Sequence, residues 1–170
     1  KHWIEEAREK IENLFGAKLN VSNYSRSGYG TEWALTAIDE KFTTPQDLVV
    51  LAFGMNDGSA DMSVVEFVEN NKQIIKLIKD KNPDVEFVLI SPPVPNKDCK
   101  AVYKEQANYK KGLQSLVSDG IAMINMTDVF LELLKKKRYC EISGNNLNHP
   151  NDFGYKFYTD AFTYLFYQLK

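Results

Sequence analysis

The feature that most constrains this chain is the alternation of short apolar runs with longer stretches of helical periodicity. Runs of strand length stand at Leu19–Ser22, Leu48–Phe53, Val85–Ile90 and Ile121–Ile124. Most of these runs are apolar almost without interruption, which is typical of parallel strands buried on both faces. Strands that alternate with crossover helices form right-handed βαβ units with helices on both sides of the sheet. The pattern therefore predicts an α/β protein.

Helical spacing of apolar residues predicts helices over Trp3–Phe15 and Val64–Ile78. Further helices are expected from about Thr31, over Tyr103–Val117 and over the aromatic segment Phe153–Leu169. The chain opens with a helix that no strand precedes, although folds of this kind usually begin with a strand. We therefore predict a three-layer α/β/α sandwich with a parallel, flavodoxin-like sheet whose first strand is missing from this sequence.

Size and composition limit the functional classes. A chain of 170 residues with 44% hydrophobic content suits one domain with a sizeable core. Its 21 basic and 23 acidic side chains nearly balance, so neither nucleic acid nor an anionic membrane is an expected partner. No apolar stretch reaches the roughly 18 residues of a membrane span. Cys99 and Cys140 with two histidines form neither a disulfide framework nor a zinc cluster.

Residue usage says more about the source than about the mechanism. The 18 Lys, 3 Arg and 14 Asn are typical of an AT-rich bacterial genome. The sequence leaves open whether the protein is cytoplasmic or secreted, and it leaves the oligomeric state open.

The loop after the second apolar run, Gly54–Ser59, is the first candidate for chemistry. Ligands bind at the carboxyl ends of the strands in an open parallel sheet. Asn56 and Asp57 would project there, and an Asn amide can donate a hydrogen bond to an oxyanion. The alternative is that Asn-Asp-Gly is turn chemistry that caps the next helix.

The loop after the first run, Asn23–Thr31, combines Gly28 and Gly30 with small hydroxyl side chains just ahead of a helix. Backbone N–H groups in such a loop can bind an anion or an oxyanion. A flexible connection has the same composition. The loop matches neither a P-loop nor a dinucleotide-binding fingerprint.

The third loop, Gly144–Tyr155, contains His149 directly before the last helix. A single histidine in a loop is often incidental. If this loop returns to the same sheet edge, however, a histidine base meets a backbone donor at Gly28 and an amide donor at Asn56. That set fits acyl transfer and lacks only its nucleophile.

Taken together, the three loops resemble the SGNH hydrolase superfamily, also known as GDSL-type esterases and lipases. Asn23–Gly28 matches the family's Asn-x-x-x-x-Gly block, and Gly54–Asp57 matches its Gly-x-Asn-Asp block. His149 and Pro150 match the end of its Asp-x-x-His-Pro block. The blocks occur in the family's order, and the resemblance spans essentially all of residues 1–170.

The resemblance implies a serine esterase that acts on small ester bonds, above all O-acetyl groups on carbohydrate, through an acyl-enzyme. His149 would be the general base and then the general acid. The Gly28 N–H and the Asn56 side chain would form the oxyanion hole. The expected partner is a small ester or an acetylated carbohydrate, and no metal or organic cofactor is implied.

This sequence departs from the family pattern at the nucleophile, because it has no Gly-Asp-Ser block. We expect residues 1–170 to form a single, N-terminally incomplete domain whose nucleophile and first strand lie upstream. Ser25, Ser27 and Ser91 lie in other contexts, and so do Cys140 and Ser143 near His149.

A second departure is Asn146, which stands where the family has an aspartate. Asn146 can orient the His149 ring but cannot supply a negative charge. Asp57, Asp152 or a main-chain carbonyl are the alternatives for this task. Two other functions also stay open: a non-catalytic member of the fold that binds glycans or another ligand, and a flavodoxin-like binding or signalling domain. The latter leaves the coincidence of Gly28, Asn56 and His149 unexplained.

Overall fold

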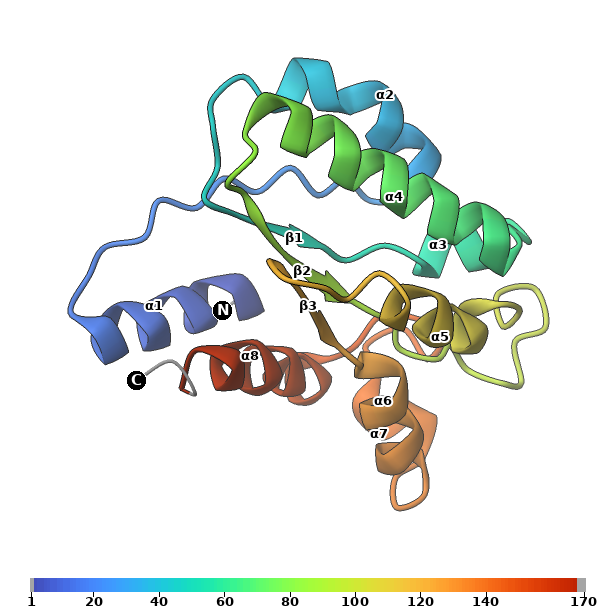
Figure 1. The fold of residues 1–170 in the computed structure, drawn as a ribbon. Coiled ribbons are helices and arrows are strands. Elements are labelled where there is room, and N and C mark those ends of the chain that lie inside the picture. The colour runs from blue at the N-terminus through green and yellow to red at the C-terminus, as the bar shows by residue number, and fades with distance from the viewer. Residues whose placement is uncertain (1, 168–170) are drawn as a thin grey trace.

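The centre of the protein is a sheet of parallel strands, seen in a computed structural model that describes residues 2–167 (Figure 1). The sheet contains β1 (Leu48–Leu51), β2 (Glu86–Ile90) and β3 (Ile121–Ile124) in that spatial order. Val50 of β1 lies beside Val88 of β2, and both pairings are parallel. The parallel sheet predicted from the apolar runs is therefore confirmed.

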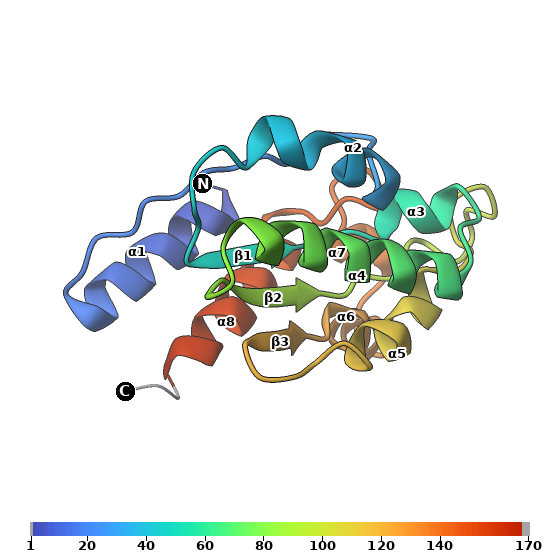
Figure 2. The same ribbon diagram turned by 45° about the horizontal axis from the view of Figure 1, so that its top comes forward.

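Helices cover both faces of this sheet (Figures 1 and 2). The α-helices are α1 (Trp3–Phe15), α2 (Thr31–Lys41), α3 (Met55–Ser59), α4 (Val64–Lys81), α5 (Tyr109–Gln114), α6 (Met126–Leu134), α7 (Tyr139–Ile142) and α8 (Asp152–Tyr167), and η1 (Gln106–Asn108) is a 3-10 helix. Helices α2 and α4 pack together over one face, and α1 packs against α8 over the other.

The central strand β2 shows why the apolar runs lack alternation. Phe87 and Leu89 belong to the core on the α2–α4 side. Val88 and Ile90 belong to the core on the α1–α8 side, and all four side chains are buried. A strand buried on both faces needs apolar side chains in both directions. The predicted three-layer α/β/α sandwich is thus confirmed.

The predicted strand at Leu19–Ser22 is wrong. This segment runs without regular structure between α1 and α2 on the β1 side of the sheet (Figures 1 and 2). Leu19 is 38% exposed and Val21 is 46% exposed. A strand is stable only when a neighbour pairs with its backbone groups, and none of the strands described in residues 2–167 lies next to this segment.

The outer edge of β1 is also open, because no further strand in the described residues pairs with it. β1 is an end strand of the sheet, and Val50 in its middle is 37% exposed. Half of the backbone groups of an edge strand lack a partner strand. The backbone groups on the outer side of β1 therefore have no partner strand among the described residues.

The other element boundaries shift by a few residues. β1 ends at Leu51, two residues before the predicted end, and α4 continues to Lys81. The expected helix over Tyr103–Val117 is helical only from Gln106 to Gln114. The last helix begins at Asp152 and is described to Tyr167, so its predicted end at Leu169 lies outside the described residues. Among residues 2–167, no helix has the length and apolar character that a bilayer crossing requires.

Candidate active site

The Gly28 and Asn56 loops are joined by the buried carboxylate of Asp57. The Asp57 side chain is 2% exposed. Its Oδ1 accepts hydrogen bonds from the Thr31 backbone N–H at 2.7 Å and from the Thr31 hydroxyl at 2.6 Å. Its Oδ2 accepts from the Gly54 N–H at 2.9 Å. Charge-assisted bonds of this kind are short and strong, so Asp57 fixes the start of α2 against the start of α3.

Gly30 lets these two loops approach each other. It caps the N-terminus of α2 but has no side chain to bind the first N–H groups of that helix. A Cβ at residue 30 would lie 2.6 Å from the Asp57 Oδ1. The Asp57 carboxylate takes the place of a capping side chain, and its negative charge meets the positive end of the α2 dipole.

The two predicted oxyanion donors lie in these joined loops. The Asn56 Nδ2 donates to the Tyr29 carbonyl oxygen at 2.8 Å, which uses one of its two N–H groups. Gly28 immediately precedes Tyr29 and has a φ of 81°, in the left-handed region that favours glycine. The turn at Gly54 is closed by Asp57, not by Asn56. The alternative that this segment only forms a turn therefore accounts for Asp57. It does not use the second N–H of Asn56, which is left for a ligand.

Asn145 organises the His149 loop, although nothing in the sequence analysis singled it out. Its Oδ1 accepts from the backbone N–H groups of Leu147, Asn148 and His149 at 2.9, 3.0 and 3.1 Å. The Ser143 hydroxyl donates to the His149 carbonyl oxygen at 2.9 Å and closes the loop. Asn side chains often bind backbone groups a few residues ahead, and that tendency was the available signal.

The His149 loop is bonded to the segment that follows β2. Asn96 follows β2, and its backbone N–H donates to the Leu147 carbonyl oxygen at 2.8 Å. The Asn96 Nδ2 donates to the Asn146 carbonyl oxygen at 2.9 Å. The Gly54 turn follows the neighbouring strand β1, which runs parallel to β2. The Gly54 turn and the segment that contains Asn96 thus follow two neighbouring parallel strands, and the His149 loop is bonded to the Asn96 segment, with His149 exposed.

The predicted supports of His149 are bonded to other groups or exposed. Asn146 has a φ of 56°. Its carbonyl oxygen accepts a hydrogen bond from the Asn96 side chain. Asp152 is exposed at the first turn of α8. Asp57 uses both oxygens on Thr31 and Gly54. Within residues 2–167, no hydrogen bond joins any of the three to the His149 imidazole.

Among the residues considered as substitute nucleophiles, Ser91 and Ser25 are hydrogen-bonded to other groups. Ser91 is fully buried, and its hydroxyl accepts from the Thr127 N–H at 3.1 Å. The Ser25 hydroxyl donates to the Asn23 Oδ1 at 2.6 Å. Ser27 is exposed in the Gly28 loop, and Cys140 is an exposed free thiol on α7. In the described part of the chain, none of them is hydrogen-bonded to the His149 ring.

The fold and the three loops together define a hydrolase family. The model of the GDSL-like Lipase/Acylhydrolase family matches residues 5–157, so the chain belongs to this family. The resemblance inferred from Asn23–Gly28, Gly54–Asp57 and His149 is confirmed.

Curated relatives include two GDSL esterase/lipases of Arabidopsis thaliana. One is 24% identical over 150 residues, which cover 72% of this chain and 62% of the relative. The other is 24% identical over 116 residues, which cover 61% of this chain and 48% of the relative. The matches thus span roughly half to three fifths of these relatives.

Solved structures show the same fold. An acetylxylan esterase from Geobacillus stearothermophilus superimposes with a TM-score of 0.79 at 15% identity, covering 95% of this chain and 79% of that one. A lipase/acylhydrolase from Enterococcus faecalis gives a TM-score of 0.76 at 21% identity, covering 95% and 83%. At such low identity the likeness concerns the fold alone.

Proposed function

We propose that this chain forms most of a serine esterase that hydrolyses small ester bonds, in particular O-acetyl groups on carbohydrate. Two contacts support the proposal: the Asn56 side chain is bonded to the Gly28 loop at Tyr29, and the His149 loop is bonded to Asn96 in the segment that follows β2. Family membership supports ester hydrolysis. The acetylxylan esterase fold neighbour is consistent with an acetylated carbohydrate substrate.

In this mechanism His149 removes the proton of a serine hydroxyl while the serine oxygen attacks the ester carbonyl. The resulting oxyanion accepts hydrogen bonds from the Gly28 N–H and from the second N–H of Asn56. His149 then protonates the leaving alcohol, and the acyl-serine remains. Water attacks this acyl-enzyme by the same route, releasing the acid and the serine. A main-chain carbonyl orients the imidazole in this proposal, or Asn146 does so once its side chain turns toward the ring, to which it is not hydrogen-bonded in this structure.

The nucleophilic serine of this proposal comes from a strand outside the given sequence. The open edge of β1, the exposed Val50 and the unpaired segment at Leu19–Ser22 support a place for such a strand between them. Parallel insertion there would bring the carboxyl end of the added strand to the edge that bears Gly28 and Asn56.

Hydrolysis of 4-nitrophenyl acetate and acetylated xylan by the full-length protein tests this function. His149→Ala should lower kcat/KM by about 10³-fold or more, because the serine loses its base. Asn56→Ala should lower kcat by about 10²- to 10³-fold, the usual loss for one oxyanion donor. The control is His2→Ala, since His2 is the other histidine and lies at the start of α1. An unchanged rate in His149→Ala would refute the proposal.

The alternative is a non-catalytic member of the fold that binds a glycan or another ligand. Asn146 favours it, because an amide replaces the family's carboxylate and is not bonded to the His149 ring. A fluorophosphonate probe followed by mass spectrometry separates the two functions. A labelled serine supports the esterase. Binding of acetylated xylo-oligosaccharides without labelling or turnover supports the binding protein.

A further inference from the structure

An open groove lies between α6 and α8 and belongs to none of the loops described above. Its volume is about 560 Å³. Its lining comes from α6, from the residues that flank this helix and from one residue of α8. The lining residues are Asn125, Asp128, Val129, Glu132, Leu133, Lys136, Lys137 and Phe157.

The floor of this α6–α8 groove is apolar. Val129, Leu133 and Phe157 are half-buried, and each packs against the core on the α1–α8 side. Part of each side chain therefore faces the groove instead of the protein interior. An aliphatic group laid over these three side chains would remove apolar surface from water, which is favourable.

The charges around the groove leave an excess of positive charge. Lys110 forms an ion pair with Asp128 and holds the pKa of the Asp128 carboxyl below its usual value. Lys135 binds Glu132 at 2.6 Å. Both acidic groups of the lining are thus already paired with lysines that do not line the groove.

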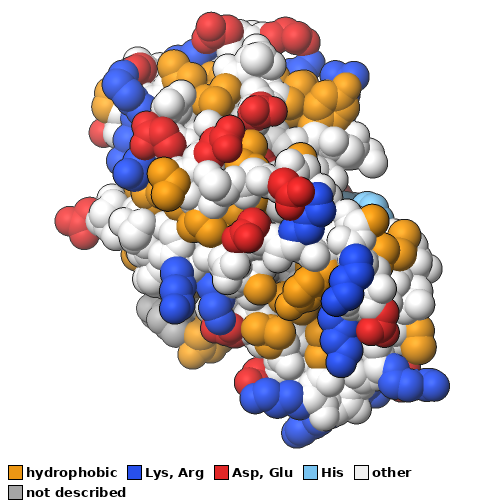
Figure 3. All heavy atoms as spheres, turned by 90° about the vertical axis from the view of Figure 1, so that its right-hand side faces the viewer, with side chains coloured by type: hydrophobic (Ala, Val, Ile, Leu, Met, Phe, Trp, Pro, Cys, Tyr) orange, Lys and Arg blue, Asp and Glu red, His pale blue; other side chains and the backbone are white. Residues whose placement is uncertain are grey.

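Two lysines of the lining are different. Within residues 2–167, neither Lys136 nor Lys137 forms an ion pair. Lys137 does interact with Glu141, because the pKa of the Glu141 carboxyl is lowered by hydrogen bonds from Arg138 and, in part, by the charge of Lys137. The Lys137 Nζ lies 5.5 Å from the centroid of the Phe153 ring. Figure 3 shows Lys and Arg side chains beside hydrophobic ones in its lower half. The groove therefore combines an apolar floor with two lysines that form no ion pair in the described residues.

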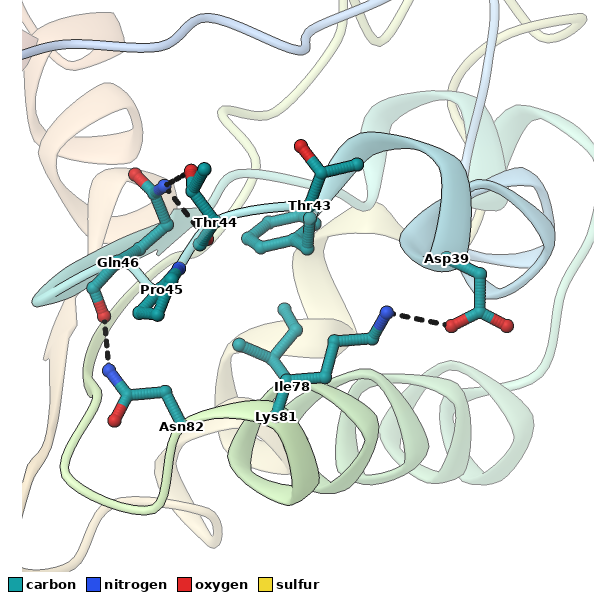
Figure 4. A pocket seen from close by; sticks show the side chains of 9 residues that line it. Asp39, Thr43, Thr44, Pro45, Gln46, Ile78, Lys81 and Asn82 are labelled. Atoms are coloured by element: carbon teal, nitrogen blue, oxygen red, sulfur yellow. Dashed lines mark hydrogen bonds and ion pairs between the residues drawn. The ribbon is translucent and has the colours of Figure 1, made fainter.

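A second hollow, of about 490 Å³, lacks this combination. It lies between the end of α2 and the end of α4 (Figure 4). Its lysine, Lys81, is paired with Asp39 at 2.9 Å. Its lining combines Phe42, Pro45 and Ile78 with polar side chains such as Thr43 and Gln46. Unlike the α6–α8 groove, its described lining therefore has no lysine without an ion-pair partner.

We propose that the α6–α8 groove binds an anionic amphiphile, namely a carboxylate that carries an aliphatic chain. The chain would lie on Val129, Leu133 and Phe157, and the carboxylate would meet Lys136 and Lys137. A cationic amphiphile would meet the same two lysines and be repelled. The proposal is independent of the esterase chemistry, because it uses no residue of the Gly28, Asn56 or His149 loops.

An NMR titration of the full-length protein with octanoate tests the proposal. Octanol and octylammonium provide chains of equal length with a neutral and a positive head. Octanoate should bind most tightly and octylammonium least tightly, and amide shifts should gather on α6 and on α8 around Phe157. Equal affinity for the three compounds, or shifts confined to another part of the protein, would overturn the proposal.

Variants separate the roles of head and chain. Lys136→Gln with Lys137→Gln should raise the Kd for octanoate about five-fold, the effect of losing two exposed charge contacts, and leave the Kd for octanol unchanged. The control removes two lysines of α4, Lys72→Gln with Lys76→Gln, which lie outside the groove. Leu133→Asn should weaken both octanoate and octanol. An unchanged octanoate Kd in the Lys136/Lys137 variant would refute the predicted head-group site, provided that its circular dichroism matches the parent chain.

Discussion

The two sides of the candidate site are held in different ways. On the side that bears Gly28 and Asn56, a buried carboxylate joins two loops that are far apart in sequence. On the side that bears His149, an exposed amide, Asn145, joins neighbours within one loop. Buried ionic hydrogen bonds are costly to break, whereas exposed neutral ones exchange readily with water. The oxyanion side is therefore the more rigid of the two.

This difference suits the chemistry that we propose. Oxyanion donors contribute most when they are fixed before the charge develops. A general base must act first on the nucleophile and then on the leaving group, and a loop with its own local bonds permits small adjustments. The experiments below ask whether the two sides differ as the contacts indicate.

The largest effect is expected at Asp57. Asp57→Ala leaves the Thr31 N–H, the Thr31 hydroxyl and the Gly54 N–H without their acceptor, so the free energy of unfolding should fall by about 3 kcal/mol or more. Asp57→Asn keeps one acceptor oxygen and should cost less. Urea unfolding followed by circular dichroism measures both. If Asp57→Ala lowered the free energy of unfolding by less than about 0.5 kcal/mol, the inference that this side is rigid would be wrong.

A pair of glycines compares the two sides directly. Gly30→Ala places a Cβ 2.6 Å from the Asp57 Oδ1 and should cost about 1–3 kcal/mol of unfolding free energy. Gly144→Ala, in the His149 loop, meets its nearest atom at 3.8 Å and should cost under about 1 kcal/mol. The same urea experiment measures both variants. Equal losses of unfolding free energy in the two variants would mean that the two sides of the site accommodate an added methyl group equally well.

Asn146 tests whether the His149 side needs a carboxylate. In the full-length enzyme, Asn146→Asp would place a carboxylate where the family has one, so turnover should rise and the pH–rate profile should change. Asn146→Ala serves as the comparison. Profiles of both variants that overlay the parent enzyme would exclude Asn146 from the mechanism.

The smallest effect concerns Tyr139, whose hydroxyl donates to the Val94 carbonyl oxygen at 3.2 Å. Burial raises the pKa of Tyr139 to about 12. Because the unfolded chain ionises near pH 10, the stability from neutral Tyr139 is complete below pH 10 and is lost between about pH 10 and 12. Tyr139→Phe should reduce the alkaline loss of stability, measured by urea unfolding at pH 9 and 11. If the unfolding free energy of Tyr139→Phe fell between pH 9 and 11 as much as that of the parent protein, Tyr139 would not be the source of the alkaline loss.

Local sequence patterns determined much of the fold. The helical periodicity of Trp3–Phe15 and the apolar run Ile121–Ile124 predicted α1 and β3 with their observed bounds. Both predictions depend only on residues close together in the sequence, because a helix and a strand buried on both faces each require a characteristic spacing of apolar residues. Asn56 could be chosen in the same way, since it follows the buried strand β1. Gly28 and His149 are chosen instead from their loop composition and from the family resemblance, because neither of their loops follows a strand in the described residues.

Only the tertiary structure decided which contacts hold these residues. Leu19–Ser22 has the composition of a strand, yet pairing depends on a neighbour that the segment itself cannot specify. Asp57 was one of the residues that the sequence suggested as a support for His149. In the structure its carboxylate instead accepts a hydrogen bond from Thr31 of the Gly28 loop. The local sequence gives the residue types at the sheet edge, whereas hydrogen bonds between distant segments depend on how the whole chain packs.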